Sequence, residues 1–129
     1  MKKDYLRNWL AKAVNDLTVA EHELTLDKEN CVTDAVCFHC QQAIEKYLKA
    51  YLISQKIDFG KTHNLEYLIK LCANRDKTFA ALDVKNLSFY AVEIRYPDDF
   101  YIPAMKEATE SFKIAQHVRD FILGKINHK

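Results

Sequence analysis

Glycine and proline are scarce in this sequence, which has only two of each among 129 residues. An all-β fold needs frequent turns, which these two residues usually supply, and a long flexible linker is usually rich in glycine. Both are therefore disfavoured. The chain is long enough to bury one hydrophobic core, and its 49% hydrophobic and 29% charged residues are ordinary for a globular protein. We therefore expect a single domain over residues 1–129.

Long apolar runs and an excess of one charge are also missing. No run is long enough to span a bilayer, and the start of the chain meets charged residues too soon to contain the apolar core of a signal peptide. We therefore expect a cytoplasmic protein. The 19 basic and 18 acidic residues nearly cancel, so the overall charge does not indicate nucleic-acid binding. A local basic patch on the folded chain is compatible with this balance.

Familiar enzyme signatures are absent as well. The sequence has no glycine-rich phosphate loop, no HExxH zinc motif and no GxSxG nucleophile turn. No spacing of its Ser, Cys and His residues singles out a catalytic triad. Patterns alone therefore assign no reaction to the chain.

Apolar residues recur at helical spacing near the start of the chain. They are Leu6, Leu10, Ala13, Leu17, Ala20 and Leu24, which advance by alternating steps of four and three. This spacing places them on one face of a helix. Lys12, Asp16 and Glu23 fall away from that face, so we expect them in solvent. The polar run at 27–30 predicts the end of the helix.

A second helix is predicted at about 33–55, and its apolar arc is wide. One stripe holds Val36, Cys40, Ala43, Tyr47 and Ala50, and an adjoining stripe holds Ile44, Leu48 and Leu52. A wide arc indicates a helix that contacts several neighbours. Gln41, Glu45 and Lys49 form its polar edge, and Glu45 and Lys49 are spaced for an ion pair along the helix.

Three further helices complete the predicted fold. The third is capped by Thr62, and its apolar face holds Leu65, Leu68, Ile69 and Cys72. The fourth is capped by Asp83 and ended by Pro97, with Leu87, Tyr90, Ala91 and Ile94 facing inward. The last has Pro103 in its first turn and a stripe of Ala104, Ala108, Ala115, Val118 and Ile122. The sequence therefore predicts an all-α protein, an antiparallel up-and-down bundle of about five helices around a four-helix core.

The four cysteines include a CxxC pair, Cys37 and Cys40, with His39 between them. A structural zinc site needs about four such ligands, and no second Cys/His cluster supplies the rest. A thioredoxin-like redox role needs a surrounding βαβ pattern, which is missing. Because both cysteines lie within the apolar pattern of the second helix, we favour free thiols buried in the core. We predict no metal site and no cofactor.

The segment before the third helix is a candidate for phosphate binding. Lys61 supplies a positive charge there, and His63 stands beside the first N–H groups of the helix, which can bind an anion. The alternative for this segment is helix capping with an exposed histidine.

The most unusual polar segment is 95–99, which begins at the end of the fourth predicted helix. The guanidinium of Arg95 can donate a forked pair of hydrogen bonds to a phosphate. It can equally brace the turn by pairing with Asp98, Asp99 or Glu45, and both interpretations stay open. Asp98 and Asp99 are too few ligands to indicate a cation site.

Four stretches of the sequence resemble the HEPN family, and they occur in the order expected of that family. Residues 9–17 resemble the first helix of these domains, 37–50 the second, 61–65 the start of the third and 88–97 the fourth. The resemblance covers nearly the whole chain. It implies one HEPN-like domain with a helical-bundle fold.

The resemblance also carries functional implications. HEPN domains are named for nucleotide binding, and stand-alone prokaryotic members are often encoded beside minimal nucleotidyltransferases. Many are ribonuclease toxins that dimerise and place an Arg and a His, separated by four to six residues, at the dimer interface. Arg95 matches that arginine, but the positions where the histidine is expected hold Phe100, Tyr101 and Ile102. Without the histidine, no evident group is placed to accept the proton of a ribose 2′-hydroxyl.

The resemblance therefore favours a non-catalytic binding module. It implies a homodimer that binds a nucleotide or an RNA phosphate and partners a minimal nucleotidyltransferase, as in toxin–antitoxin systems. Arg95, Lys61 and His63 would contact phosphate, and Tyr96 would stack on a base. One alternative is a metal-independent ribonuclease toxin that uses Arg95 with a histidine from elsewhere, His39 or His63. Another is a structural adaptor without a ligand.

Aromatic residues near Arg95 predict where the chain dimerises. They are Tyr90, Tyr96, Phe100 and Tyr101. Aromatic side chains often dominate protein interfaces, so we expect these to seed one. The alternative is that they complete the core of the monomer.

Overall fold

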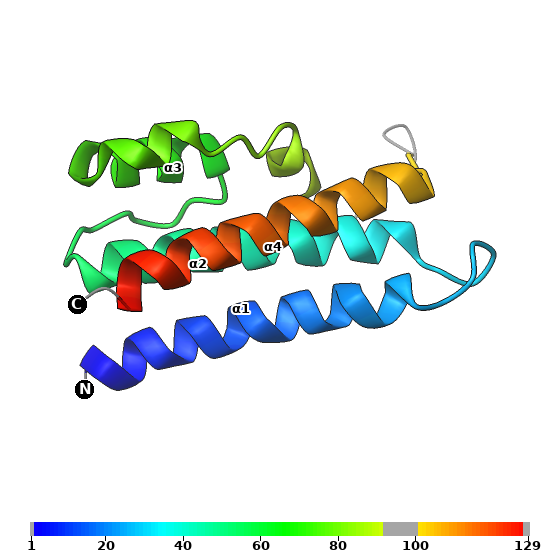
Figure 1. Cartoon of the computed structure of the whole chain (residues 1–129), viewed down its shortest axis with the longest axis horizontal. Helices are drawn as coiled ribbons and strands as arrows, with labels where there is room; N and C mark the ends of the chain where they lie inside the picture. Colours follow the sequence, from blue (N-terminus) through cyan, green and yellow to red (C-terminus); the bar gives the residue numbers. More distant parts are fainter. Residues whose placement is uncertain (1, 92–100, 128–129) are drawn as a thin grey trace.

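The computed structural model describes residues 2–91 and 101–127, and these ranges contain helices and loops but no strands. The helices are α1 (Lys2–Leu24), α2 (Thr33–Ser54), α3 (Leu65–Arg75) and α4 (Met105–Asn127), with two short 3₁₀ helices, η1 (Lys77–Ala81) and η2 (Leu87–Ala91). Figure 1 shows α1, α2 and α4 as three long rods, with α3 and the 3₁₀ segments beside them. The predicted all-α bundle is confirmed, with four α-helices in the described ranges rather than about five.

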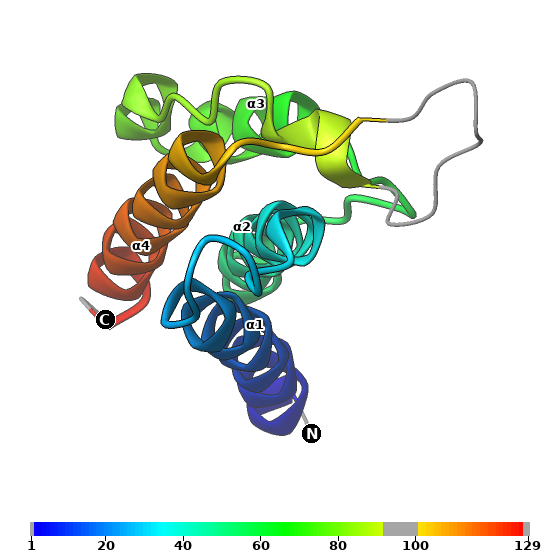
Figure 2. The same cartoon turned by 90° about the vertical axis from the view of Figure 1, so that its right-hand side faces the viewer.

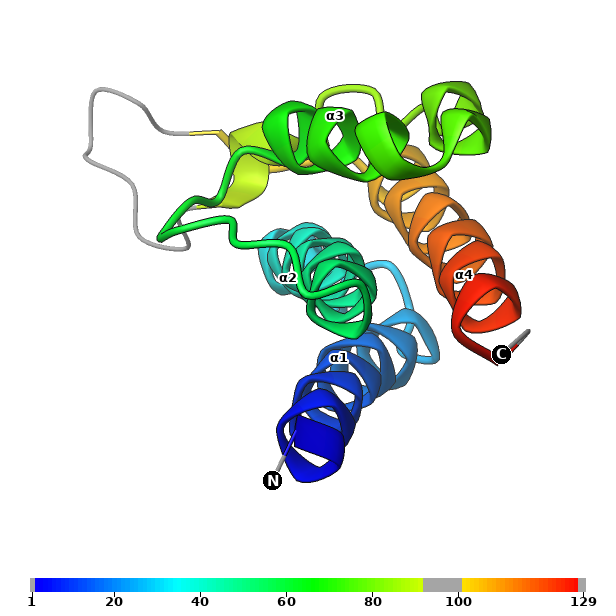
Figure 3. The same ribbon diagram turned by 90° about the vertical axis from the view of Figure 1, so that its left-hand side faces the viewer.

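Helix α2 is the centre of the bundle. It contacts α1, α3, η2 and α4, and Figures 2 and 3 show it between α1 on one side and the layer of α3 on the other. Its buried side chains include Val36, Ile44, Leu48 and Leu52. The wide apolar arc of this segment therefore reflects neighbours on several sides, as predicted.

Small residues let the long helices approach α2 closely. Helix α1 contributes Ala13, Leu17 and Ala20 to the core, and α4 contributes Ala108, Ala115, Val118 and Ile122. The predicted stripes are therefore largely confirmed, although Leu10 is only partly buried and Ala104 is exposed. Ile94 lies outside the described residues.

The prediction of a fourth α-helix is wrong for those of its residues that the structure describes, up to residue 91. Within that part the chain forms only η2, because η1 ends at Ala81, before the predicted cap at Asp83. Asp83 accepts a hydrogen bond from the N–H of Lys85, and Lys85 has a φ of 50°, which a right-handed α-helix does not allow. The chain therefore turns between the two 3₁₀ helices. Pro97, the predicted end of this element, lies outside the described residues.

Two helix starts differ from their prediction. The cap of α3 is Asn64, whose side-chain oxygen accepts from the N–H of Tyr67, while Thr62 accepts from the N–H of Asn64 just before the helix. Helix α4 begins at Met105, so Pro103 precedes it. The carbonyl of Pro103 accepts a hydrogen bond from the hydroxyl of Thr33, which ties the start of α4 to the start of α2.

Several polar side chains expected in solvent are covered. Asp16 is 9% exposed, and Gln41, Glu45 and Lys49 are buried rather than lying on an open edge. Glu23 is partly covered and accepts a hydrogen bond from the N–H of Val32. Buried charges need partners, and the partners of Asp16, Glu45 and Lys49 are described below. Within the described residues, no helix is long and apolar enough to cross a membrane.

Candidate functional site

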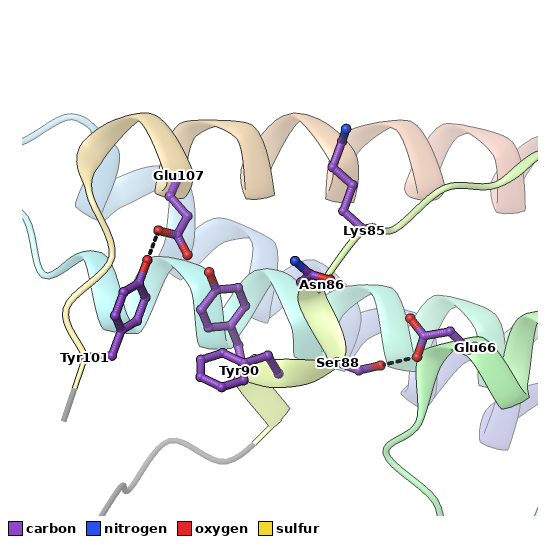
Figure 4. Close-up of a pocket in the computed structure, with 8 residues that line it drawn as sticks. Glu66, Lys85, Asn86, Ser88, Tyr90, Tyr101 and Glu107 are labelled. Carbon is purple, nitrogen blue, oxygen red and sulfur yellow. Dashed lines mark hydrogen bonds between the residues drawn. The ribbon is translucent and has the colours of Figure 1, made fainter. Parts of the chain in front are cut away.

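A surface cavity of about 490 Å³ lies beside η2 (Figure 4). Its lining comes from the start of α3, from the segment through η2, and from the start of α4 with the residues before it: Glu66, Lys85, Asn86, Ser88, Phe89, Tyr90, Tyr101 and Glu107. A cavity of this size suits a small molecule. It is therefore the candidate ligand site.

Aromatic rings form one wall of this cavity. The ring of Phe89 lies 5.5 Å from that of Tyr90 and 6.2 Å from that of Tyr101, both edge to face. Tyr101 is 49% exposed and Phe89 is 52% exposed. These rings offer both a stacking surface for a planar group and an exposed apolar patch.

Hydrogen bonds fix the polar wall. The hydroxyl of Tyr101 donates to Glu107 at 2.5 Å, and the hydroxyl of Ser88 donates to Glu66 at 2.8 Å (Figure 4). Ser88 also accepts from the N–H of Leu65 at 2.9 Å, which joins η2 to the first turn of α3. Lys85 supplies the one positive side chain among the lining residues.

The cavity adjoins, in sequence, the segment that carries Arg95. Tyr90 precedes residues 92–100 and Tyr101 follows them, and both line the cavity. Arg95, Tyr96 and Phe100 lie outside the described residues. Tyr90 is partly buried, whereas Tyr101 faces solvent.

Lys61 and His63 are exposed residues before α3, and neither lines this cavity. The Nδ1 atom of His63 lies 3.0 Å from Oε1 of Glu45, which also accepts from Gln41 at 3.2 Å. Lys49 donates to the other oxygen of Glu45 at 2.9 Å. The predicted Glu45–Lys49 pair is therefore confirmed, but it is buried and has a third partner in His63.

Two aromatic rings complete the surroundings of Lys49. Its Nζ atom lies 5.6 Å from the ring centroid of Trp9 and 5.4 Å from that of Phe59. An ammonium group is attracted to the faces of such rings. The buried charge of Lys49 is therefore offset by one carboxylate and two aromatic rings.

A second histidine has a matching arrangement on the α1 side of α2. The Nδ1 atom of His39 lies 2.8 Å from one oxygen of Asp16, and Lys46 donates to the other oxygen at 2.5 Å. Asp16 is buried between α1 and α2 and pairs with two side chains of α2, His39 and Lys46. The sequence alone does not distinguish His39 or His63 from an ordinary surface histidine, because the carboxylate partner of each is distant along the chain.

The CxxC pair lies in the core, as predicted. Cys37 and Cys40 are fully buried, and burial raises the pKa of Cys37 to about 11 and raises that of Cys40 further. Among the described residues, no three His, Cys, Asp or Glu side chains are grouped so that they could hold a metal ion.

The cavity residues Glu66, Asn86, Ser88 and Glu107 were missed by sequence reasoning. They come from separate elements, and each is an ordinary polar residue in its local pattern. Only the tyrosines carried a signal, as candidates for an interface.

Comparison with known proteins places this fold. The sequence model of the HEPN domain family matches residues 6–126 of this chain. The crystal structure of ST0689, an archaeal HEPN homologue, is 24% identical, with a TM-score of 0.66 over 94% of this chain and 97% of that one. The crystal structure of TT1696 from Thermus thermophilus is 26% identical, with a TM-score of 0.66 over 93% of this chain and 97% of that one. Comparison with curated proteins gives no match.

Proposed function

Because the chain belongs to the HEPN domain family, we propose that it binds a nucleotide or an RNA phosphate, partners a minimal nucleotidyltransferase and has no catalysis of its own. The observation that supports this most directly is the cavity beside η2. Its aromatic and polar walls come from both sides of the segment that carries Arg95.

Different residues of the cavity lining fit different parts of a nucleotide. The rings of Tyr90 and Tyr101 can stack on a base, and the amide of Asn86 can both donate and accept at a base edge. Glu66 and Glu107 can accept from ribose hydroxyls but repel phosphate. The phosphate is therefore assigned to Arg95, with Tyr96 as a further stacking group. Lys61 and His63, before α3, are assigned to the phosphates of a longer ligand such as RNA.

An exposed apolar patch supports an assembly role. Phe89, Tyr101 and Ile102 are each about half exposed, and the first two rings are in contact. Apolar surface of this kind is typical of protein interfaces. We assign it to the homodimer, which leaves the cavity at the edge of the interface. The nucleotidyltransferase partner and the toxin–antitoxin setting rest on the family alone.

A titration that measures both binding and turnover of the ligand tests this function. ATP and a short RNA are titrated into the purified protein, and both the melting temperature and the intact ligand are measured. A ligand that binds the folded state raises the melting temperature with its concentration. Stabilisation with intact ligand is expected, and Tyr101→Ala is expected to weaken it. Co-purification with a co-expressed minimal nucleotidyltransferase tests the partner.

The ribonuclease alternative is favoured by one observation, the pairing of His63 with Glu45. Nδ1 of His63 faces the carboxylate of Glu45, which only accepts, so the tautomer that fits this contact leaves Nε2 free to accept a proton. The side chain is 68% exposed, against 24% for His39, so His63 is the better placed of the two. RNA cleavage in EDTA that is lost in both Arg95→Ala and His63→Ala, but kept in His39→Ala, would establish this alternative.

A further inference from the structure

A second cavity, of about 420 Å³, lies on the α1–α2 face of the bundle. It is lined by Tyr5, Asn8, Trp9, Lys12 and Lys46. The four α1 residues follow helical spacing and so share one face, and Lys46 comes from α2. Helix α1 begins at the end of the bundle opposite the start of α4 (Figure 1). None of these residues lines the cavity beside η2.

The charge of this second cavity is positive. Two lysines line it and no carboxylate does, whereas the cavity beside η2 has two glutamates and one lysine. Lys12 is exposed and has no ion-pair partner in the part of the chain that the structure describes. Lys46 is held by Asp16, but an ammonium group has three hydrogens, so it can still donate to a second acceptor. Because Asp16 balances the charge of Lys46, the unpaired positive charge at this cavity is that of Lys12.

The two aromatic side chains of this cavity are held in place, Tyr5 exposed and Trp9 partly buried. Tyr5 is 54% exposed, and its ring lies 6.3 Å from that of Trp9, edge to face. Trp9 is supported from the other direction by Phe59 at 6.3 Å and by Lys49 at 5.6 Å. A ring fixed in this way loses little freedom when a ligand stacks on it. Tyr5 and Trp9 therefore offer a preformed stacking surface.

We propose that Tyr5, Trp9, Lys12 and Lys46 form a second binding site, which takes a nucleoside phosphate unit. The base stacks on the exposed aromatic surface, and the phosphate is bound by the two ammonium groups. Aromatic rings beside lysines are the combination that binds single-stranded nucleic acids, because every base has a stacking face and every linkage has a charge. The unit is either a free nucleotide or part of a single strand. The site does not include Arg95.

The position of the single tryptophan allows a direct test. Trp9 is the only tryptophan in the chain, so intrinsic tryptophan fluorescence comes from a residue that lines this site. AMP and an oligoadenylate RNA are titrated separately into the full-length protein, in low salt and EDTA. Saturable quenching is expected with at least one of the two probes. Quenching by both identifies a site for free nucleotides, and quenching by the RNA alone identifies a site for strands.

Variants separate this site from its surroundings. Lys12→Glu reverses an exposed charge without touching the core and should weaken quenching at least tenfold, and Tyr5→Ala should weaken it as well. Lys113→Ala, an exposed lysine on α4, is the matched control and should leave it unchanged. Arg95→Ala should also leave it unchanged, so failure of the first site does not affect this test. Absence of quenching by both probes, or equal quenching in Lys12→Glu, would overturn the proposal, as would its loss in Arg95→Ala.

Discussion

The imidazole of His63, which is largely exposed, is tied to Glu45, which is almost fully buried, by a contact of 3.0 Å between Nδ1 and Oε1. His63 lies before α3 and Glu45 lies in the middle of α2, so the contact fastens the α2–α3 connection onto the central helix. Asp16 and His39 repeat the arrangement between α1 and α2. In both cases a lysine of α2 binds the second carboxylate oxygen.

Removing the charge of Glu45 tests the buried network. In Glu45→Gln the volume is kept, but Lys49 loses its counter-ion inside the bundle. Breaking a buried pair in this way costs about 3–5 kcal/mol. We expect a loss of that size in the free energy of unfolding, measured by urea denaturation. His63→Ala keeps the Glu45–Lys49 pair and should cost much less, and equal losses in the two variants would mean that the pair is not the stabilising element.

Leu48 tests the packing of the core. It is fully buried in α2, where several elements meet. Leu48→Ala leaves a cavity and should lower the free energy of unfolding by about 2–5 kcal/mol. The same substitution at Leu26, which is 44% exposed, is the matched control. A Leu48 effect as small as that of Leu26 would mean that the assigned face of α2 is wrong.

The helices were predictable where a local pattern fixes them. The stripes of α1, α2 and α4 follow from apolar spacing, because a helix that packs on a core needs one apolar face. The burial of Glu45 and Lys49 was not predictable, because it depends on Trp9, Phe59 and His63, which arrive from other parts of the chain. A polar edge in the sequence is therefore not always an exposed edge.

Two further differences have one local and one long-range cause. Leu87, Tyr90 and Ala91 fit the apolar spacing of an α-helix, but after the turn at Lys85 they lie in a 3₁₀ segment instead. The cavity beside η2 unites Glu66, Tyr101 and Glu107, which belong to different parts of the fold. No spacing rule along the chain brings such residues together, so the cavity itself could not be predicted from the sequence.

The cysteines should differ in reactivity. Burial raises the pKa of Cys37 to about 11 and that of Cys72 to about 12, and it raises that of Cys40 as well. The pKa of Cys31 is also raised, by burial and by Glu23, but its side chain is partly exposed. Because only an accessible thiolate reacts quickly, native protein at mildly alkaline pH should show one fast thiol with a disulfide reagent. Cys31→Ser should remove it, whereas fast reaction of several thiols would contradict the buried assignment.

Asp76 should contribute to the acid sensitivity of the fold. Hydrogen bonds from the hydroxyl of Thr78 and from Lys125 lower the pKa of Asp76 to about 2. A lowered pKa means that the contribution is complete above the ordinary carboxylate pKa of about 4 and is lost as the pH falls toward 2. We expect Asp76→Asn to be less stable than the parent near neutral pH and equal to it near pH 2, by urea midpoints. A difference that stays constant over this pH range would exclude the titration of Asp76 as its cause.

The central claim, binding of a nucleotide phosphate through Arg95, is tested most directly by titrating ATP into the parent protein and into Arg95→Lys by calorimetry. Lysine keeps the charge but cannot donate a forked pair of hydrogen bonds, so about 1–3 kcal/mol of binding should be lost, which is roughly a 5- to 150-fold weaker affinity. The melting temperature without ligand should stay nearly unchanged. Equal affinity with a lowered melting temperature would instead make Arg95 a structural brace, and absence of ATP binding in the parent protein would contradict the account.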